Sequence, residues 1–92
     1  MIGISTQVSL YPLGQQDLQG PIQSVLQVFE AHDLSYETGP MSTLVWGDSA
    51  TVFRALHEAF EQAATYGSTV MQVTVSNACP LPSADAARSS ED

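Results

Sequence analysis

Two hydrophobic periods alternate along the chain, and their order is the feature that most constrains the fold. Apolar residues recur at every second position in residues 2–11 and 69–76, a pattern typical of half-buried strands. They recur at helical spacing from Gly20-Pro21 to about His32 or Asp33, and again over residues 49–66. Between the helices, the short extended segments 34–38 and 41–47 flank the break Gly39-Pro40 and are expected to pair as a hairpin. The predicted order is β-α-β-β-α-β.

This order predicts an α+β fold, a ferredoxin-like βαββαβ sandwich with a four-stranded antiparallel sheet and both helices on one face. Asp48 is the expected N-cap of the second helix, and Gly67 its C-cap. That helix is expected to bury Val52, Phe53, Leu56, Phe60 and Ala63. We assign residues 1–77 to one domain. Residues 78–92 are rich in Pro, Ser, Ala and acid and lack periodicity, which predicts a flexible acidic C-terminal tail.

The charge balance excludes two classes of partner. The chain carries ten acidic residues against Arg54 and Arg88, has no lysine, and has a net charge of −8. Binding a phosphate backbone or an anionic membrane requires cations, so neither nucleic acid nor membrane is expected as a partner. A cationic or neutral small molecule is compatible with this balance. The amino terminus lacks a signal-peptide pattern and no apolar stretch approaches the roughly 20 residues that span a bilayer, so a cytoplasmic location is expected.

The sequence offers no catalytic or metal-binding motif. A single cysteine, Cys79, excludes an intramolecular disulfide and a zinc site built from several thiolates. His57 and Glu58 do not begin an H-E-x-x-H motif, because position 61 is glutamate. His57 is expected to be solvated, and His32 to lie at a helix end. We therefore expect no catalytic residues, no metal and no cofactor.

The face of the predicted sheet away from the helices, here called the helix-free face, has an unusual composition. It would carry hydroxyls, amides and a tyrosine: Ser5, Gln7, Ser9, Tyr11, Gln72, Thr74 and Ser76. A merely solvated face usually carries Lys, Glu and Arg, so this composition favours a face covered by another subunit, with room for a hydrogen-bonded guest. Every second side chain of the short strands 34–38 and 41–47 also lies on this face. Either Thr43 with Met41 and Val45, or Ser42 with Leu44 and Trp46, is compatible with the sequence.

Three stretches carry a resemblance to a known family. They are VSLYPLG at residues 8–14, SYETGPMSTLVWGD at residues 35–48 and VFRALHEAF at residues 52–60. Together they resemble the small thiamine-binding proteins of the MTH1187/YkoF type, over residues 4–77. The family pattern usually has glycine where this chain has Ser42, and many members carry an acid in place of Trp46.

The resemblance implies a function and a set of candidate residues. It implies a non-catalytic protein that binds thiamine or a hydroxymethylpyrimidine-like ligand at a subunit junction, as a homodimer or homotetramer formed through sheet faces or edges. The ligand-binding candidates at matching positions are Ser9, Tyr11, Glu37, Met41, Thr43 and Trp46. A carboxylate such as Glu37 suits the cationic thiazolium, and an aromatic ring against that cation contributes roughly 0.5–2 kcal/mol. The alternatives are a cofactor-free oligomeric enzyme of the monooxygenase or isomerase type, and a purely structural oligomerisation module.

Overall fold

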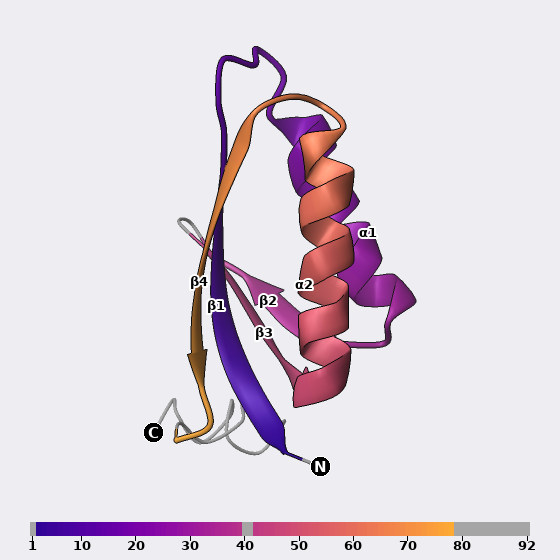
Figure 1. Ribbon diagram of the computed structural model, residues 1–92, viewed down its shortest axis with the longest axis vertical. Coiled ribbons are helices and arrows are strands. Elements are labelled where there is room, and N and C mark those ends of the chain that lie inside the picture. Colours follow the sequence, from indigo (N-terminus) through magenta and orange to yellow (C-terminus); the bar gives the residue numbers. More distant parts are fainter. Residues whose placement is uncertain (1, 40–41, 79–92) are drawn as a thin grey trace.

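The computed structural model of the protein describes residues 2–39 and 42–78. It confirms the predicted order of elements and the ferredoxin-like α+β fold. The sheet forms one layer and both helices form the other (Figure 1). The elements are β1 (Gly3–Pro12), α1 (Gln19–Ala31), β2 (Ser35–Thr38), β3 (Thr43–Asp48), α2 (Ser49–Ala64) and β4 (Thr69–Ser76).

The four strands pair antiparallel in the order β2-β3-β1-β4, so β2 and β4 are the two edges of the sheet. β1 pairs with β4 over eight consecutive residues, from Ser5 opposite Ser76 to Pro12 opposite Thr69. Directly opposed residues in a sheet point to the same face. The residues of β1 and β4 that were predicted to share the helix-free face therefore lie opposite each other, for example Gln7 and Thr74.

The core lies between the sheet and the two helices. It is formed by Ile4, Val8, Val25, Val28, Phe29, Leu34, Val45, Val52, Ala55, Leu56, Ala59 and Ala63. Thr6 is the one polar side chain buried with them among the described residues, at 1% exposure. Its Oγ1 donates a hydrogen bond of 2.9 Å to the Val45 carbonyl, so the buried hydroxyl is satisfied.

The pairing of β1 with β3 settles the register that the sequence left open. Thr6 lies opposite Val45, and Val8 opposite Thr43, so Thr43 and Val45 face the helices. Leu44 and Trp46 face the other way, opposite Gln7 and Ser5. Met41, the remaining member of the Thr43 register, lies outside the described residues, as do Pro40 and residues 79–92. The predicted division into a domain and a tail falls at the edge of that range and stays a prediction.

The predicted burial of Phe53 and Phe60 is wrong, because these side chains are 52% and 41% exposed. The buried face of α2 runs instead through Val52, Leu56 and three alanines, Ala55, Ala59 and Ala63. Small side chains let the helix approach the sheet closely. At about 100° per residue, Phe53 and Phe60 then lie on the flank of α2 rather than beneath it.

The ends of α2 are defined by local chemistry. Asp48 is the N-cap as predicted, and its carboxylate accepts a hydrogen bond of 3.2 Å from the Thr51 amide. At the other end the C-cap is Thr65 and the helix stops at Ala64, slightly earlier than expected. Gly67 lies two residues past the cap with a φ of +144°, a conformation that glycine adopts readily.

Candidate functional site

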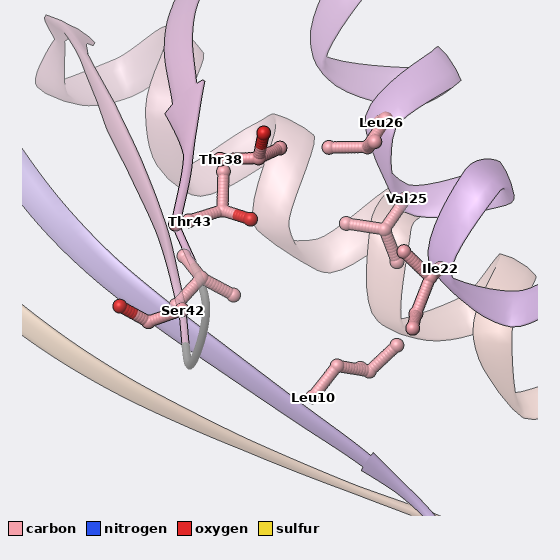
Figure 2. Close-up of a pocket in the computed structure, with 9 residues that line it drawn as sticks. Leu10, Ile22, Val25, Leu26, Thr38, Ser42 and Thr43 are labelled. Atoms are coloured by element: carbon pink, nitrogen blue, oxygen red, sulfur yellow. The ribbon is translucent and has the colours of Figure 1, made fainter. Parts of the chain in front are cut away.

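A small pocket opens on the helix side of the sheet, between the β2–β3 hairpin, β1 and the first half of α1 (Figure 2). Its volume is about 200 Å³. It is lined by Val8, Leu10, Ile22, Val25, Leu26, Thr38, Gly39, Ser42 and Thr43. We call it the hairpin pocket.

Strand register and helix spacing bring these residues together. Thr38 lies directly opposite Thr43 in the β2–β3 pairing, so both β-branched side chains stand side by side at the end of the hairpin. On the other wall, Ile22, Val25 and Leu26 follow the i, i+3, i+4 spacing that aligns residues on one face of a helix. One wall therefore carries hydroxyls and the other is aliphatic.

The polar groups of the pocket are neutral. In Figure 2 the Thr43 hydroxyl is directed toward the α1 side of the pocket. Within residues 2–39 and 42–78, neither the Thr38 nor the Thr43 hydroxyl has an intramolecular hydrogen-bond partner. None of the described lining residues is charged. The pocket can therefore offer hydroxyl donors and acceptors, together with an apolar surface, to a small uncharged group.

Ser42 borders the pocket but turns its hydroxyl away from it (Figure 2). That hydroxyl lies toward the helix-free face, where it accepts a hydrogen bond of 3.2 Å from Nε2 of Gln7. The backbone of the hairpin is closed by the Gly39 amide, which donates to the Ser42 carbonyl at 2.8 Å. These contacts join Ser42 to Gln7 of β1 and to Gly39 at the end of β2.

The six predicted site residues do not form one cluster. Ser9, Tyr11, Glu37 and Trp46 belong to the helix-free register, since Ser9 opposes Gln72, Tyr11 opposes Val70, Glu37 opposes Leu44 and Trp46 opposes Ser5. Thr43 alone of the described candidates lines the hairpin pocket, on the opposite side of the sheet. Met41 lies outside the described residues. Contact of these six residues with a ligand stays a prediction.

Sequence reasoning missed Thr38 and the α1 wall. The signal for Thr38 was available, because a short hairpin across Gly39-Pro40 brings Thr38 and Thr43 to matching positions. The helical spacing of Ile22, Val25 and Leu26 predicts an apolar stripe on the first helix, but not that this stripe borders a pocket. Ile22 is in fact 42% exposed at the pocket edge.

Two hydrogen-bonded pairs lie elsewhere and stabilise the fold. Nε2 of His32 lies 2.8 Å from Oε1 of Glu58, joining the end of α1 to α2. The Tyr36 hydroxyl donates to the Glu30 carboxylate at 2.5 Å. This bond, with partial burial and the negative charge of Glu30, raises the pKa of Tyr36 above its ordinary value.

The described residues show no group of three or more His, Cys, Asp or Glu side chains able to hold a metal ion. None of the helices in that same part of the chain combines the length and the apolar character needed to cross a bilayer. His57 is solvated as predicted, with 74% of its side chain exposed.

The fold and the site define a small ferredoxin-like α+β domain with a neutral, hydroxyl-bearing pocket under its first helix. The sequence profile of the YKOF-related family matches residues 4–82. The chain therefore belongs to the YKOF-related family, which confirms the resemblance seen in the sequence.

Solved structures show the same fold at low sequence identity. The hypothetical protein MJ1052 of Methanocaldococcus jannascii superposes with a TM-score of 0.80 at 22% identity, covering 99% of this chain and 95% of that one. The protein SP2199 of Streptococcus pneumoniae gives a TM-score of 0.78 at 22% identity, covering 99% and 100%. The "putative thiamine biosynthesis/salvage protein" TM0486 of Thermotoga maritima gives 0.70 at 18% identity, covering 79% and 81%. A comparison with curated protein sequences finds no match.

Proposed function

We propose that this protein is a non-catalytic, cytoplasmic binding protein for thiamine or a hydroxymethylpyrimidine-like molecule, and that the hairpin pocket holds the pyrimidine ring. Family membership and the name of the T. maritima neighbour support a thiamine-related ligand. The observation that carries the proposal is the pair of opposed threonines, Thr38 and Thr43, on the polar wall of an otherwise aliphatic pocket. An aminopyrimidine edge offers donors and acceptors that such hydroxyls pair with.

The size of the pocket favours one ring over two. Pockets that bury a drug-sized ligand usually measure roughly 300–1,000 Å³. The hairpin pocket measures about 200 Å³, so it suits a single six-membered ring with short substituents. In thiamine, the thiazolium ring and its side chain would extend out of the pocket.

The charge of the site favours an unphosphorylated ligand. A phosphate is normally held by Arg, Lys or a helix N-terminus. The described lining has no basic side chain, and the chain as a whole carries a net charge of −8. We expect phosphate esters of the same ligand to bind more weakly.

The composition of the helix-free face supports assembly with a second copy. Apart from Asp48, which caps α2, Glu37 is the one charged residue in the helix-free register of the described strands. The same face carries four large apolar or aromatic side chains, Tyr11, Leu44, Trp46 and Val70. In the proposed homodimer or homotetramer, these side chains and Ser9 belong to the subunit junction. The pocket is open in a single chain, where Ile22, Thr38 and Gly39 are exposed, and a neighbouring copy would close it.

No observation favours the enzyme alternative. Enzymes of that type require a His, Asn or Trp inside a cavity between sheet and helices. The described lining of the hairpin pocket has none of these, and no carboxylate. A threonine hydroxyl without a neighbouring base is a hydrogen-bonding group rather than a nucleophile.

Titration calorimetry with hydroxymethylpyrimidine, thiamine and thiamine phosphate tests the proposal. Removing the pocket hydroxyl by Thr43→Val should weaken both unphosphorylated ligands by about two- to tenfold, the worth of one hydrogen bond at about 0.5–1.5 kcal/mol. The matched control Thr74→Val makes the same change on the opposite face of the sheet and should leave affinity unchanged. Wild-type affinity in Thr43→Val, or no binding of either ligand at millimolar concentration, would contradict the pocket assignment.

A further inference from the structure

A second hollow lies beside the hairpin pocket, between α1 and the edge strand β2. It has a volume of about 280 Å³ and is lined by Gln23, Leu26, Gln27, Glu30 and Tyr36. We call it the Glu30 hollow. Leu26 also lines the hairpin pocket, where Figure 2 shows it directed toward Thr38. The two hollows therefore border the same side chain and follow one another along α1.

The two walls of this double site advance in step. On β2, Thr38 borders the hairpin pocket and Tyr36 borders the Glu30 hollow, and alternate residues of a strand point to the same face. On α1, Ile22, Leu26 and Glu30 follow one another at four-residue intervals on one side of the helix. Two residues of a strand span about 6.6 Å and four residues of a helix about 6 Å, so both walls advance by nearly the same distance. A step of this length suits two rings joined through one methylene group.

The two hollows differ in charge. The described lining of the hairpin pocket is neutral, whereas the Glu30 hollow has one carboxylate and no basic side chain in its described lining. The Glu30 carboxylate accepts a hydrogen bond of 2.5 Å from the Tyr36 hydroxyl. A carboxylate has about four lone-pair sites, so this bond positions Glu30 and leaves it able to accept from a ligand.

The Tyr36 ring adds an aromatic surface to the same hollow. It is half-buried and packs against Phe29, with the ring centroids 6.1 Å apart, so its position is fixed from the core side. A cation that lies beside both a carboxylate and an aromatic ring is attracted to each of them. The Glu30 hollow therefore favours a positively charged group.

Glu37, the carboxylate that the sequence favoured for a cationic ring, lies on the other side of the sheet. It opposes Leu44 in the helix-free register, so it does not face the hairpin pocket. Among the described residues that line the two hollows, Glu30 is the one charged side chain. On the pocket side of the sheet, the carboxylate next to the ligand thus comes from α1 rather than from β2.

We infer that the Glu30 hollow is a subsite for the cationic part of a two-part ligand, and that Glu30 makes the protein prefer a ring-linked cation over the neutral ring alone. The inference rests on the proposed function, because it takes the hairpin pocket as the site of the pyrimidine ring. In thiamine, the thiazolium would lie beside Glu30 and the Tyr36 ring. The amides of Gln23 and Gln27 would pair with its hydroxyethyl group.

Titration calorimetry with thiamine and hydroxymethylpyrimidine tests the inference on the wild-type chain and three variants. Glu30→Gln retains an acceptor for the Tyr36 hydroxyl but removes the charge, and it should weaken thiamine about two- to fivefold, the worth of an exposed ion pair. Glu30→Lys replaces attraction by repulsion and should weaken thiamine about tenfold. Neither variant should change the affinity for hydroxymethylpyrimidine. The matched control Glu37→Gln makes the same change in net charge as Glu30→Gln, from −8 to −7, on the opposite side of the sheet, and should bind both ligands as wild type.

The neutral ligand separates failure of the subsite from failure of the proposed function. Unchanged binding of hydroxymethylpyrimidine shows that a variant is folded and that its hairpin pocket is intact. With that binding in place, wild-type affinity for thiamine in both Glu30 variants would overturn the inference alone. A loss of thiamine in Glu37→Gln but not in Glu30→Gln would overturn it too, and so would a wild-type chain that binds thiamine no more tightly than hydroxymethylpyrimidine. A wild-type chain that binds neither ligand would contradict the proposed function and the subsite together.

Discussion

Gln7 and Ser42 are joined across the helix-free face by a hydrogen bond of 3.2 Å, while the next residue after Ser42, Thr43, faces the helices. This relationship shows that neighbouring residues of one extended segment point to the two opposite faces of the sheet. The Ser42 side contributes to a nearly uncharged sheet face, and the Thr43 side contributes to the hairpin pocket. A one-residue shift of β3 would exchange the two sets of side chains and abolish both surfaces.

The buried hydroxyl of Thr6 provides a test of the register. Thr6→Val keeps the shape of the side chain but removes the hydrogen bond to the Val45 carbonyl. We expect the free energy of unfolding to fall by about 0.5–1.5 kcal/mol. Urea denaturation followed by circular dichroism measures this change. Thr74→Val, on the exposed face of β4, serves as the control and should stay within about 0.5 kcal/mol of wild type.

The N-cap of α2 gives a second stability prediction. Asp48→Ala removes the acceptor for the Thr51 amide and should lower the free energy of unfolding by about 1 kcal/mol. Asp48→Asn retains a side-chain oxygen at the cap and should recover most of that loss. If alanine and asparagine destabilise the protein equally, the cap is not the source of the effect.

The Tyr36–Glu30 bond predicts a dependence of stability on alkaline pH. Because the folded-state pKa of Tyr36 is raised, the bond stabilises the protein fully below the ordinary tyrosine value of 10.0. This contribution is lost as the pH rises from there through the folded-state pKa. Thermal unfolding measured upward from pH 9, about one unit below that value, should show the loss in wild type and a smaller one in Tyr36→Phe. Identical pH profiles would contradict the assignment.

The sequence alone predicted those features that depend on local chemistry. The strand alternation in residues 2–11, the Asp48 cap and the break at Gly39 each leave a signature within a few residues, and they sufficed for the order of elements and the fold. The polar helix-free face followed from the same alternation.

The remainder depended on long-range contacts. Alternation in β3 is equally compatible with either register, and only the pairing of Thr6 with Val45 distinguishes them. Phe53 and Phe60 were assigned to the core because they are apolar and lie at the margin of the predicted buried face of the helix. An apolar side chain at such a margin is buried only if another element packs against it. Here α1 packs on the opposite flank of α2 and leaves them exposed. The hairpin pocket was not predicted because its walls come from four separate elements, β1, α1, β2 and β3.

The helix-free face gives a prediction about assembly. Thr74→Lys adds a charge opposite Gln7, within the face that we expect a second copy to cover. Sedimentation equilibrium should show weaker association than in Gln27→Lys, which carries the same charge change on α1. A wild-type chain that sediments as a monomer with this face hydrated would contradict the proposed junction.

A crystal structure of the protein soaked with hydroxymethylpyrimidine tests the central claim most directly. The account predicts density for one planar ring in the hairpin pocket, between Ile22 and Leu26 of α1 and the hydroxyls of Thr38 and Thr43. An empty pocket at saturating ligand, or a ring bound only on the helix-free face beside Glu37 and Trp46, would contradict it.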